Sequence, residues 1–287
     1  PIAAFAHALS AKPGATALVL RASNHITHSP DLGSSLRRLH LQPFWRRAHH
    51  IIAVSRSVAD SLVSGLGIPA SRITVLPSPI LPPDLASRAA GDPGHPWLHS
   101  RNPARPVIVG LGRFVHQKGF DVLLNAFALV HRERPCRLLL FGDGPQRGAL
   151  EARIRQLGLE DAVSLPGVTP NPYAVLSRAD LFVLPSRWEG LPAVLVEALA
   201  FGCPVVAADC PGGVAEVLEG GAGALVPPGD AAALADAMAR TLAQPPDRQT
   251  LQQAIRPYHT GPAVTAYETW LMSYLEQRAA PLVALAT

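Results

Sequence analysis

Short apolar runs alternate with longer amphipathic segments along most of the 287-residue chain. The runs are rich in Val, Ile and Leu and end near Gly, Ser or Pro, a pattern typical of strands that are buried on both faces of a sheet. Nine runs are predicted as strands, over residues 15–20, 50–55, 72–76, 106–112, 137–142, 162–165, 181–184, 204–208 and 223–226. Helical patterns lie between most of them, so the chain is predicted to be an α/β protein with doubly wound parallel sheets.

The chain is long enough for two domains, and a proline-rich segment divides the strands into two groups. We predict an N-terminal domain over 1–81, a linker over 82–105 and a second domain over 106–260. Residues 261–287 are predicted to form a helix that packs back on the first domain. Because the chain begins at Pro1 and its first strand pattern follows almost at once, we expect the N-terminal domain to be incomplete.

Composition supports a globular protein, with 48% hydrophobic and 16% charged residues. No apolar run approaches the roughly 18 residues of a membrane span, and the N-terminus lacks the pattern of a signal peptide. The three cysteines fit neither paired disulfides nor a zinc site. These features predict a cytoplasmic protein.

The net charge of +4 favours anionic partners. Basic and apolar side chains are mixed in SSLRRLHLQPFWRRAHH, which contains Arg37, Arg38, Arg46 and Arg47. Such a stretch can rest on an anionic membrane surface, although Pro43 interrupts a single helix and a solvated helix face is the simpler interpretation. No zinc knuckle or RNA-binding aromatic motif is present, so nucleic acid is not an expected partner.

The loop after the predicted strand 106–112 carries glycines and two cations. Gly112, Arg113 and Lys118 lie between this strand and a predicted helix that begins near Gly119. Backbone amides and cationic side chains in such a loop can bind a diphosphate. A solvated basic loop is the alternative.

The next strand ends in GDGPQRG, with Gly142, Gly144 and Gly148. The spacing is looser than that of a dinucleotide-binding loop, and no acidic residue follows where a ribose ligand would be expected, so a nicotinamide cofactor is disfavoured. Gly142 and Gly144 are better explained by a tight turn against a ligand, or by a turn alone.

Two glutamates lie eight positions apart in the nearly uncharged run SRWEGLPAVLVEALAFG. Glu189 is predicted in a loop, and Glu197 within a helix that ends at Gly202. The amides of Gly190 and Leu191 are then near a helix N-terminus, where phosphate binds favourably. Carboxylates accept paired hydrogen bonds from vicinal hydroxyls, so a sugar or ribose explains both glutamates. Salt bridges to Arg187 or Arg113 are the alternative.

These motifs resemble a known family. SRWEGLPAVLVEALAFGCPVVAADCPGGVAEVL resembles the donor-site signature of family 4 retaining glycosyltransferases of the GT-B fold (glycosyltransferase group 1), and GRFVHQKGFDVLLNAFA resembles the phosphate loop of that family. The similarity extends through NPYAVLSRADLFVLPS, GALVPPGDAAALADAM and AHHIIAVSRSVADSLVSGLGIPASRITVLPSPI. It implies two Rossmann-like domains that face a cleft, the N-terminal one incomplete here.

The resemblance also implies roles for individual residues. Arg113 and Lys118 would bind the diphosphate of a nucleotide sugar, Glu197 the ribose, and Glu189 the transferred sugar. The amides of Gly190 and Leu191 would assist the leaving phosphate, and the backbone near Gly167 and Val168 would meet the base. Members of the family retain the anomeric configuration by front-face attack, so Glu189 is expected to bind substrate without acting as a base.

Three departures from the family pattern stand out. Gly212 to Ala215 replace a serine-glycine-proline-arginine run that often precedes the glutamate at position 216, and Ser78 replaces an asparagine before the linker. Where the family commonly presents a histidine to the acceptor, Arg21, Asn24 and His25 are available, and Arg21 and His25 are the candidates.

The sequence therefore predicts a retaining hexosyltransferase. It would move a hexosyl or N-acetylhexosaminyl group from a UDP-sugar to a lipid-linked or polysaccharide acceptor in cell-envelope glycan synthesis, on the inner face of the cytoplasmic membrane. No metal or other cofactor is expected, because no paired aspartates suit a nucleotide-bound cation. A nucleotide-sugar epimerase and a non-catalytic donor-binding remnant remain as alternatives.

Overall fold

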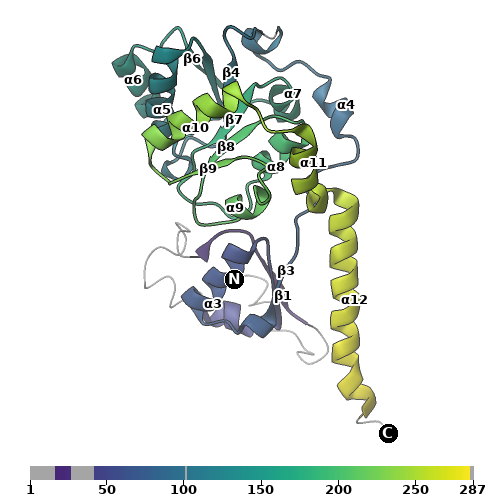
Figure 1. The fold of residues 1–287 in the computed structure, drawn as a ribbon. Helices are drawn as coiled ribbons and strands as arrows, with labels where there is room; N and C mark the ends of the chain where they lie inside the picture. The colour runs from purple at the N-terminus through teal and green to yellow at the C-terminus, as the bar shows by residue number, and fades with distance from the viewer. Residues whose placement is uncertain (1–16, 27–41, 101, 285–287) are drawn as a thin grey trace.

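A computed structural model describes residues 17–26, 42–100 and 102–284 of the chain. All nine predicted strands are present, and they form two parallel sheets, one in each domain (Figure 1). The predicted fold class is confirmed. The first strand lies a few residues later than its apolar run suggested, over β1 (Val19–Ala22).

The small domain is built on a three-stranded parallel sheet in the order β1-β2-β3, in which β2 spans His50–Ala53 and β3 spans Ile73–Val75. Helix α3 (Arg56–Leu66) packs on the sheet through Val58, Leu62 and Leu66, which are buried. A helical turn over 42–47 precedes β2, with Arg46 and Arg47 exposed; Arg37 and Arg38 lie outside the described residues.

The large domain is built on a six-stranded parallel sheet in the order β6-β5-β4-β7-β8-β9. Its strands are β4 (Val107–Leu111), β5 (Arg137–Phe141), β6 (Val163–Gly167), β7 (Leu181–Leu184), β8 (Val205–Ala208) and β9 (Ala224–Val226). This is the order of two βαβαβ halves that meet at their first strands. The order reverses between β4 and β7, where a ligand-binding crevice is expected.

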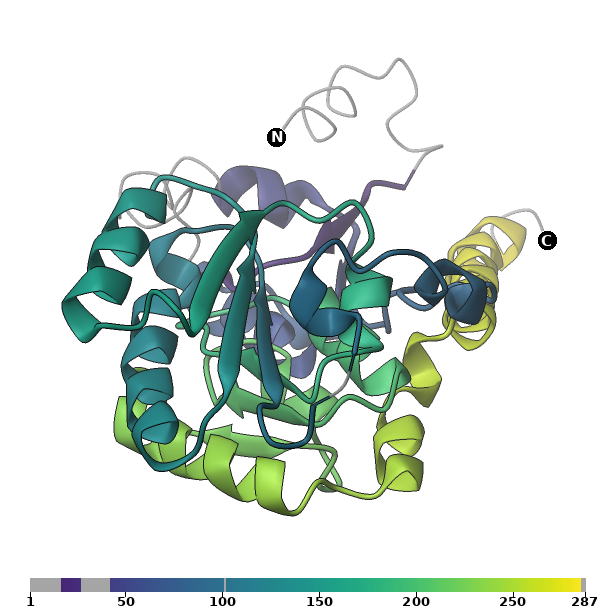
Figure 2. The same cartoon turned by 90° about the horizontal axis from the view of Figure 1, so that it is seen from above.

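Helices cover both faces of this sheet (Figures 1 and 2). One core contains side chains of α5 (Phe120–Glu133), α6 (Arg147–Leu157) and α10 (Ala231–Ala243). The other contains side chains of α7 (Pro172–Leu176), α8 (Ala193–Ala200), α9 (Val214–Val217) and α11 (Arg248–Ala254). Alternate strand residues enter opposite cores, as Ile108 and Val109 do, which explains why the strands read as unbroken apolar runs.

The segment predicted as a linker, 82–105, packs against the large domain. It contains α4 (Leu85–Ala89) and a 3-10 turn over Pro96–Leu98. Leu98 is buried in the core, and the Arg137 guanidinium lies 4.7 Å from the centre of the Trp97 ring. The chain crosses between the sheets earlier, where Ile80 and Leu81 both donate to the Tyr258 carbonyl at 3.0 Å.

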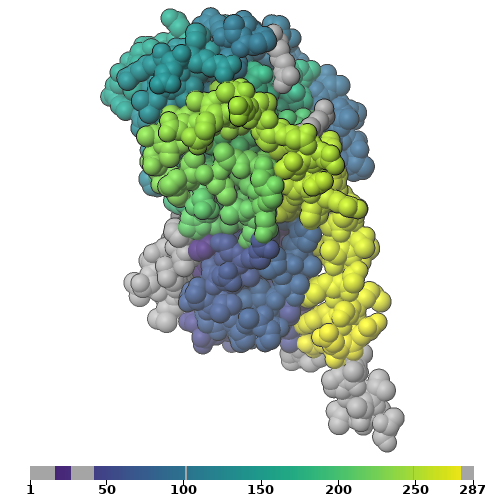
Figure 3. Space-filling model, in the orientation of Figure 1, coloured from purple at the N-terminus to yellow at the C-terminus, as the bar shows by residue number. Residues whose placement is uncertain are grey.

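The last helix, α12 (Thr260–Ala284), runs from the large domain along the small domain (Figure 3). The Trp270 and Tyr274 rings lie 5.2 and 5.5 Å from the His50 ring on β2. In the part of the chain that the structure describes, no helix combines the length and apolarity that a bilayer crossing requires.

Candidate functional site

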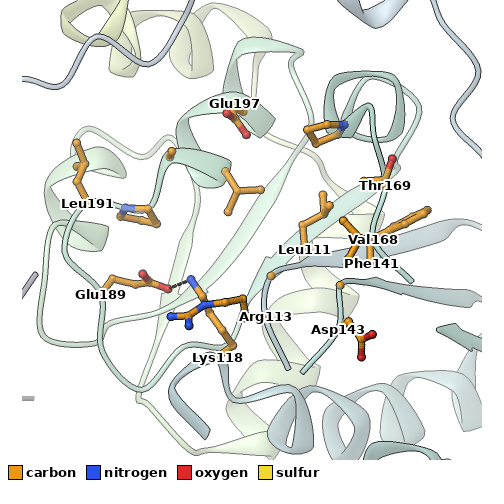
Figure 4. Close-up of a pocket in the computed structure, with 16 residues that line it drawn as sticks. Leu111, Arg113, Lys118, Phe141, Asp143, Val168, Thr169, Glu189, Leu191 and Glu197 are labelled. Atoms are coloured by element: carbon orange, nitrogen blue, oxygen red, sulfur yellow. Dashed lines mark hydrogen bonds and ion pairs between the residues drawn. The ribbon is translucent and has the colours of Figure 1, made fainter. Parts of the chain in front are cut away.

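A cavity of about 520 Å³ lies at the carboxyl ends of β4, β5 and β7, at the point where the strand order reverses. Most of the residues predicted from the sequence line it (Figure 4). They come from four separate loops and one helix: Gly112, Arg113, Lys118, Gly142, Val168, Leu191, Glu189 and Glu197. Parallel strands end at one edge of a sheet, so these distant segments meet there.

The loop after β4 approaches the loop after β5 without intervening side chains. A Cβ on Gly142 would lie 1.9 Å from the Gly112 carbonyl oxygen, so only glycine permits this contact. Gly144 packs against the backbone of Phe114 and does not line the cavity. Gly112 and Gly142 thus form part of the cavity wall, and Gly144 supports the wall through its contact with the backbone of Phe114.

Lys118 and Glu189 form a buried ion pair at the cavity wall. Lys118 Nζ lies 2.6 Å from Glu189 Oε1, and the exposed fractions of the two side chains are 17% and 7%. The Ser186 hydroxyl donates to the same oxygen at 2.7 Å. Among the described residues, Glu189 Oε2 has no partner, so one carboxylate oxygen remains for a ligand.

Ser186 was not identified from the sequence. Its position three residues before Glu189, at the carboxyl end of β7, is a weak signal, because serine is common in loops. Asp143 and Thr169 also line the cavity and were missed as well, because Asp and Thr are likewise common in loops.

Arg113 is exposed and extends into the mouth of the cavity beside the Lys118–Glu189 pair (Figure 4). Within the described ranges, its guanidinium makes no hydrogen bond or ion pair. Five N–H donors are therefore available to an anion at this position.

Glu197 faces the cavity from α8. Burial raises the pKa of its carboxyl above the ordinary value. No described side chain or amide donates a hydrogen bond to it, and its negative charge in turn contributes to the raised pKa of Tyr173, after burial. A half-buried carboxylate without a partner is costly, so a ligand with hydroxyl donors would satisfy it.

Hydrogen bonds from Arg187, in the loop after β7, join this loop to the segment that follows β4. Its guanidinium donates to Asp121 at 2.7 and 2.9 Å and to the His116 carbonyl at 2.8 Å, and its amide donates to Gln117 at 2.7 Å. Hydrogen bonding to Arg187 lowers the pKa of Asp121. The alternative in which Arg187 or Arg113 pairs with the two glutamates is not what the structure contains.

The remaining predicted residues are distributed differently. Gly190 forms an isolated antiparallel bridge with Asn24 of the small domain, and Pro192, Ala193 and Val194 at the start of α8 line the cavity. Gly167 lies in β6, where its carbonyl accepts from the Gly142 amide at 2.8 Å, and Val168 beyond it is 75% exposed.

The two acceptor-side candidates do not reach this cavity. Arg21 donates to the Ser78 hydroxyl at 2.7 Å and lines a different cavity, between the small domain and α12. His25 lines a third cavity, between α3 and the loop after β8. In the described ranges, no group of three or more His, Cys, Asp and Glu side chains could hold a metal ion.

Comparisons with known proteins define the family. Residues 96–257 match the model described as glycosyl transferases group 1, and residues 1–82 match the model described as glycosyltransferase family 4. The first match covers more than half of the chain, which therefore belongs to the group 1 glycosyltransferases.

Two curated relatives and one solved structure illustrate the similarity. The 2-deoxystreptamine glucosyltransferase of Streptomyces kanamyceticus is 33% identical over 205 residues, which are 70% of this chain and 53% of that protein. The putative colanic acid biosynthesis glycosyltransferase WcaL of Salmonella typhimurium is 31% identical over 228 residues, 75% of this chain and 53% of that protein. Anabaena HepE in complex with UDP-glucose is similar with a TM-score of 0.66 at 25% identity, covering 94% of this chain and 73% of that chain. The chain spans about half the length of these curated relatives.

Proposed function

We propose that the cavity binds a nucleoside diphosphate sugar, most simply a UDP-sugar, and that the chain contributes the donor site of a retaining glycosyltransferase. The observation that carries the proposal is the arrangement of Arg113, the Lys118–Glu189 pair and the unpartnered Glu197 around one cavity. The UDP-glucose complex of HepE, a protein of similar fold, supports the choice of donor.

Arg113 and the N-terminus of α8 are the proposed diphosphate site. The Arg113 guanidinium offers several N–H donors, and the helix start adds partial positive charge. Lys118 lies next to them and, when a diphosphate is bound, its ammonium is shared between the phosphate and Glu189. In this proposal side chains neutralise the diphosphate, so a chelator should leave UDP affinity unchanged.

Glu197 is the proposed ribose ligand. Its carboxylate is partly buried, and its two oxygens can accept hydrogen bonds from two adjacent hydroxyls. The exposed Val168 and the neighbouring Thr169 form the cavity wall on the side of β6, where the base would lie.

Glu189 is proposed to bind the transferred sugar through Oε2. Lys118 and Ser186 hold Oε1, so this carboxylate is positioned as a hydrogen-bond acceptor. In front-face transfer, the bond from the anomeric carbon to the leaving phosphate oxygen breaks as the acceptor oxygen bonds to the same face. The acceptor proton passes to the leaving phosphate, so no protein base is needed.

The proposed product class is a glycan of the cell envelope, with a lipid-linked or polysaccharide acceptor. The name of the WcaL relative, a colanic acid biosynthesis glycosyltransferase, is consistent with this class. Association with the inner membrane face rests on the basic stretch that includes exposed Arg46 and Arg47. Vesicle flotation with and without anionic lipid tests that association.

The test of the donor site is calorimetric titration with UDP, GDP and ADP, followed by UDP-sugars. Lys118→Ala and Glu197→Ala should each weaken UDP binding roughly tenfold or more, since each removes a charged partner. Asp161→Ala, an exposed position outside the cavity, is the control. If no nucleotide binds the folded chain, or if neither cavity substitution changes the affinity, the proposal is wrong.

A further inference from the structure

The two domains meet through a set of polar contacts beyond the donor cavity. Both oxygens of the Glu216 carboxylate, in the short helix α9 that follows the loop after β8, accept from the backbone of α3 in the small domain. The Arg56 amide donates to Oε2 at 2.9 Å, and the Ser57 amide donates to Oε1 at 3.0 Å. Arg56 also forms a 2.9 Å ion pair with Glu219.

The electrostatics of α3 explain why this contact is favourable. The Ser55 hydroxyl accepts from the Val58 amide, so the amides of Arg56 and Ser57 have no acceptor within their own helix. Glu216 supplies that acceptor from the other domain, and its negative charge lies at the positive end of the helix dipole. Its side chain is 18% exposed, so water screens the interaction only in part.

The same loop is joined to the segment that carries Glu189. The Glu189 amide donates to the Pro211 carbonyl at 2.8 Å, and the Gly213 amide donates to the Gly190 carbonyl at 2.6 Å. From the small domain, the Ser57 hydroxyl accepts from the Gly212 amide at 3.0 Å. The α3 N-terminus, the loop after β8 and the Glu189 segment therefore form one continuous hydrogen-bonded unit.

The two covalent connections between the domains lie next to each other. The chain crosses near Leu81 and returns after Tyr258, and these two crossings lie side by side, since Leu81 and His259 form a bridge. Two adjacent crossings act as a single hinge. Contacts away from the hinge must then determine how often the domains are closed.

We propose that Glu216 is the positioning residue that holds the small domain closed over the donor site and couples closure to the Glu189 segment. The inference deepens the proposed function, because it assigns a residue outside the donor cavity to the assembly of the complete site. Glu216 does not line the donor cavity, so its loss should open the domains while UDP binding persists.

The test measures the distance between spin labels on the two domains. All three native cysteines are buried, so added thiols at Val63 in α3 and Arg155 in α6, both exposed, can be labelled selectively. Double electron–electron resonance is recorded without nucleotide for the labelled parent and for Glu216→Ala, Glu216→Gln and Glu219→Ala. UDP affinity and melting temperature are measured for the same proteins.

We expect Glu216→Ala to lower the ratio of closed to open protein roughly ten- to hundredfold, as for loss of hydrogen bonds to a charged group. Glu216→Gln keeps one acceptor oxygen and should give an intermediate shift. Glu219→Ala removes only an exposed pair and should change the ratio less than about twofold. Added salt should lower the ratio of closed to open protein more in the parent than in the Glu216→Ala variant, because salt screens the interaction that the variant lacks.

Two results overturn the inference. One is a distance distribution that is the same in the parent and in both Glu216 variants. The other is a fall in the UDP affinity of the Glu216 variants by the same factor as the fall in their ratio of closed to open protein. Glu216 would then act through the donor site. This test is independent of the proposed function, because the distances are measured without nucleotide. A chain that fails to bind UDP would still show whether Glu216 holds the two domains together.

Discussion

Replacing Lys118 by methionine should destabilise the large domain by removing the charge partner of Glu189. At an effective dielectric constant of about 20, charges 2.6 Å apart attract with about 6 kcal/mol, but the loss of hydration of both groups cancels much of this. Removal of one partner from a buried pair costs about 3 to 5 kcal/mol, because the other charge stays buried. Since Lys118 is 17% exposed, we expect about 3 kcal/mol, or roughly 6 to 12 °C in melting temperature.

The assay is thermal and urea unfolding followed by circular dichroism, with a double-mutant cycle. Glu189→Gln keeps the hydrogen bond from Ser186 and removes the buried charge, so the double variant Lys118→Met/Glu189→Gln should recover at least half of the lost stability. If Lys118→Met changes the melting temperature by less than a degree or two, or if the two substitutions are additive, the buried pair is not the interaction described here.

Three further substitutions in the large domain are expected to have measurable effects. Burial raises the pKa of Glu197 in the folded chain, so the ionised carboxylate destabilises the fold at pH values above that pKa. Below the ordinary pKa of glutamate the carboxyl is protonated in both the folded and the unfolded chain, and the destabilisation disappears. Glu197→Gln should therefore raise the melting temperature at about pH 7.5 but not near pH 4, while UDP affinity falls; an equal change at both pH values would contradict the assignment. Arg187→Lys cannot reproduce the paired contact with Asp121 and should lower stability by about 1 to 2 kcal/mol and weaken UDP binding, with Arg155→Lys on an exposed helix face as the control. Gly119→Ala places a Cβ 2.1 Å from the Pro185 carbonyl oxygen at a φ of +64°, so we expect a loss of several kcal/mol in chemical denaturation; a neutral result would show that the two loops can separate at low cost.

Much of the fold could be predicted because each strand is buried on both faces. A strand such as Val107–Leu111 must be apolar at every position to enter two cores, and this leaves a local signal that needs no knowledge of its neighbours. The exposed β9 edge and the short β3 give weaker signals. The segment 82–105 was harder to interpret, because prolines indicate an irregular chain but do not indicate what Trp97 and Leu98 pack against.

The candidate site was predicted from the type and order of its residues, but not from their pairing. Lys118 and Glu189 were expected at one ligand, yet their direct contact spans 71 positions and depends on the adjacency of β4 and β7. Ser186 was overlooked, because a serine after a strand has no distinctive pattern. Arg21 was expected beside the acceptor, whereas the structure directs it to Ser78 at the hinge.

The sequence by itself determined the alternation of strands and helices, the turn positions that require glycine, and the presence of two cations after one strand and of two glutamates after another. These are local properties, set by burial and by backbone conformation. Only the tertiary structure decided which oxygen of Glu189 is engaged, that Glu197 has no partner among the described residues, and that Glu216 meets the amides of Arg56 and Ser57 across 160 and 159 positions. Such contacts depend on the order of strands in the sheet and on the position of one domain against the other, and neither leaves a periodic trace along the chain.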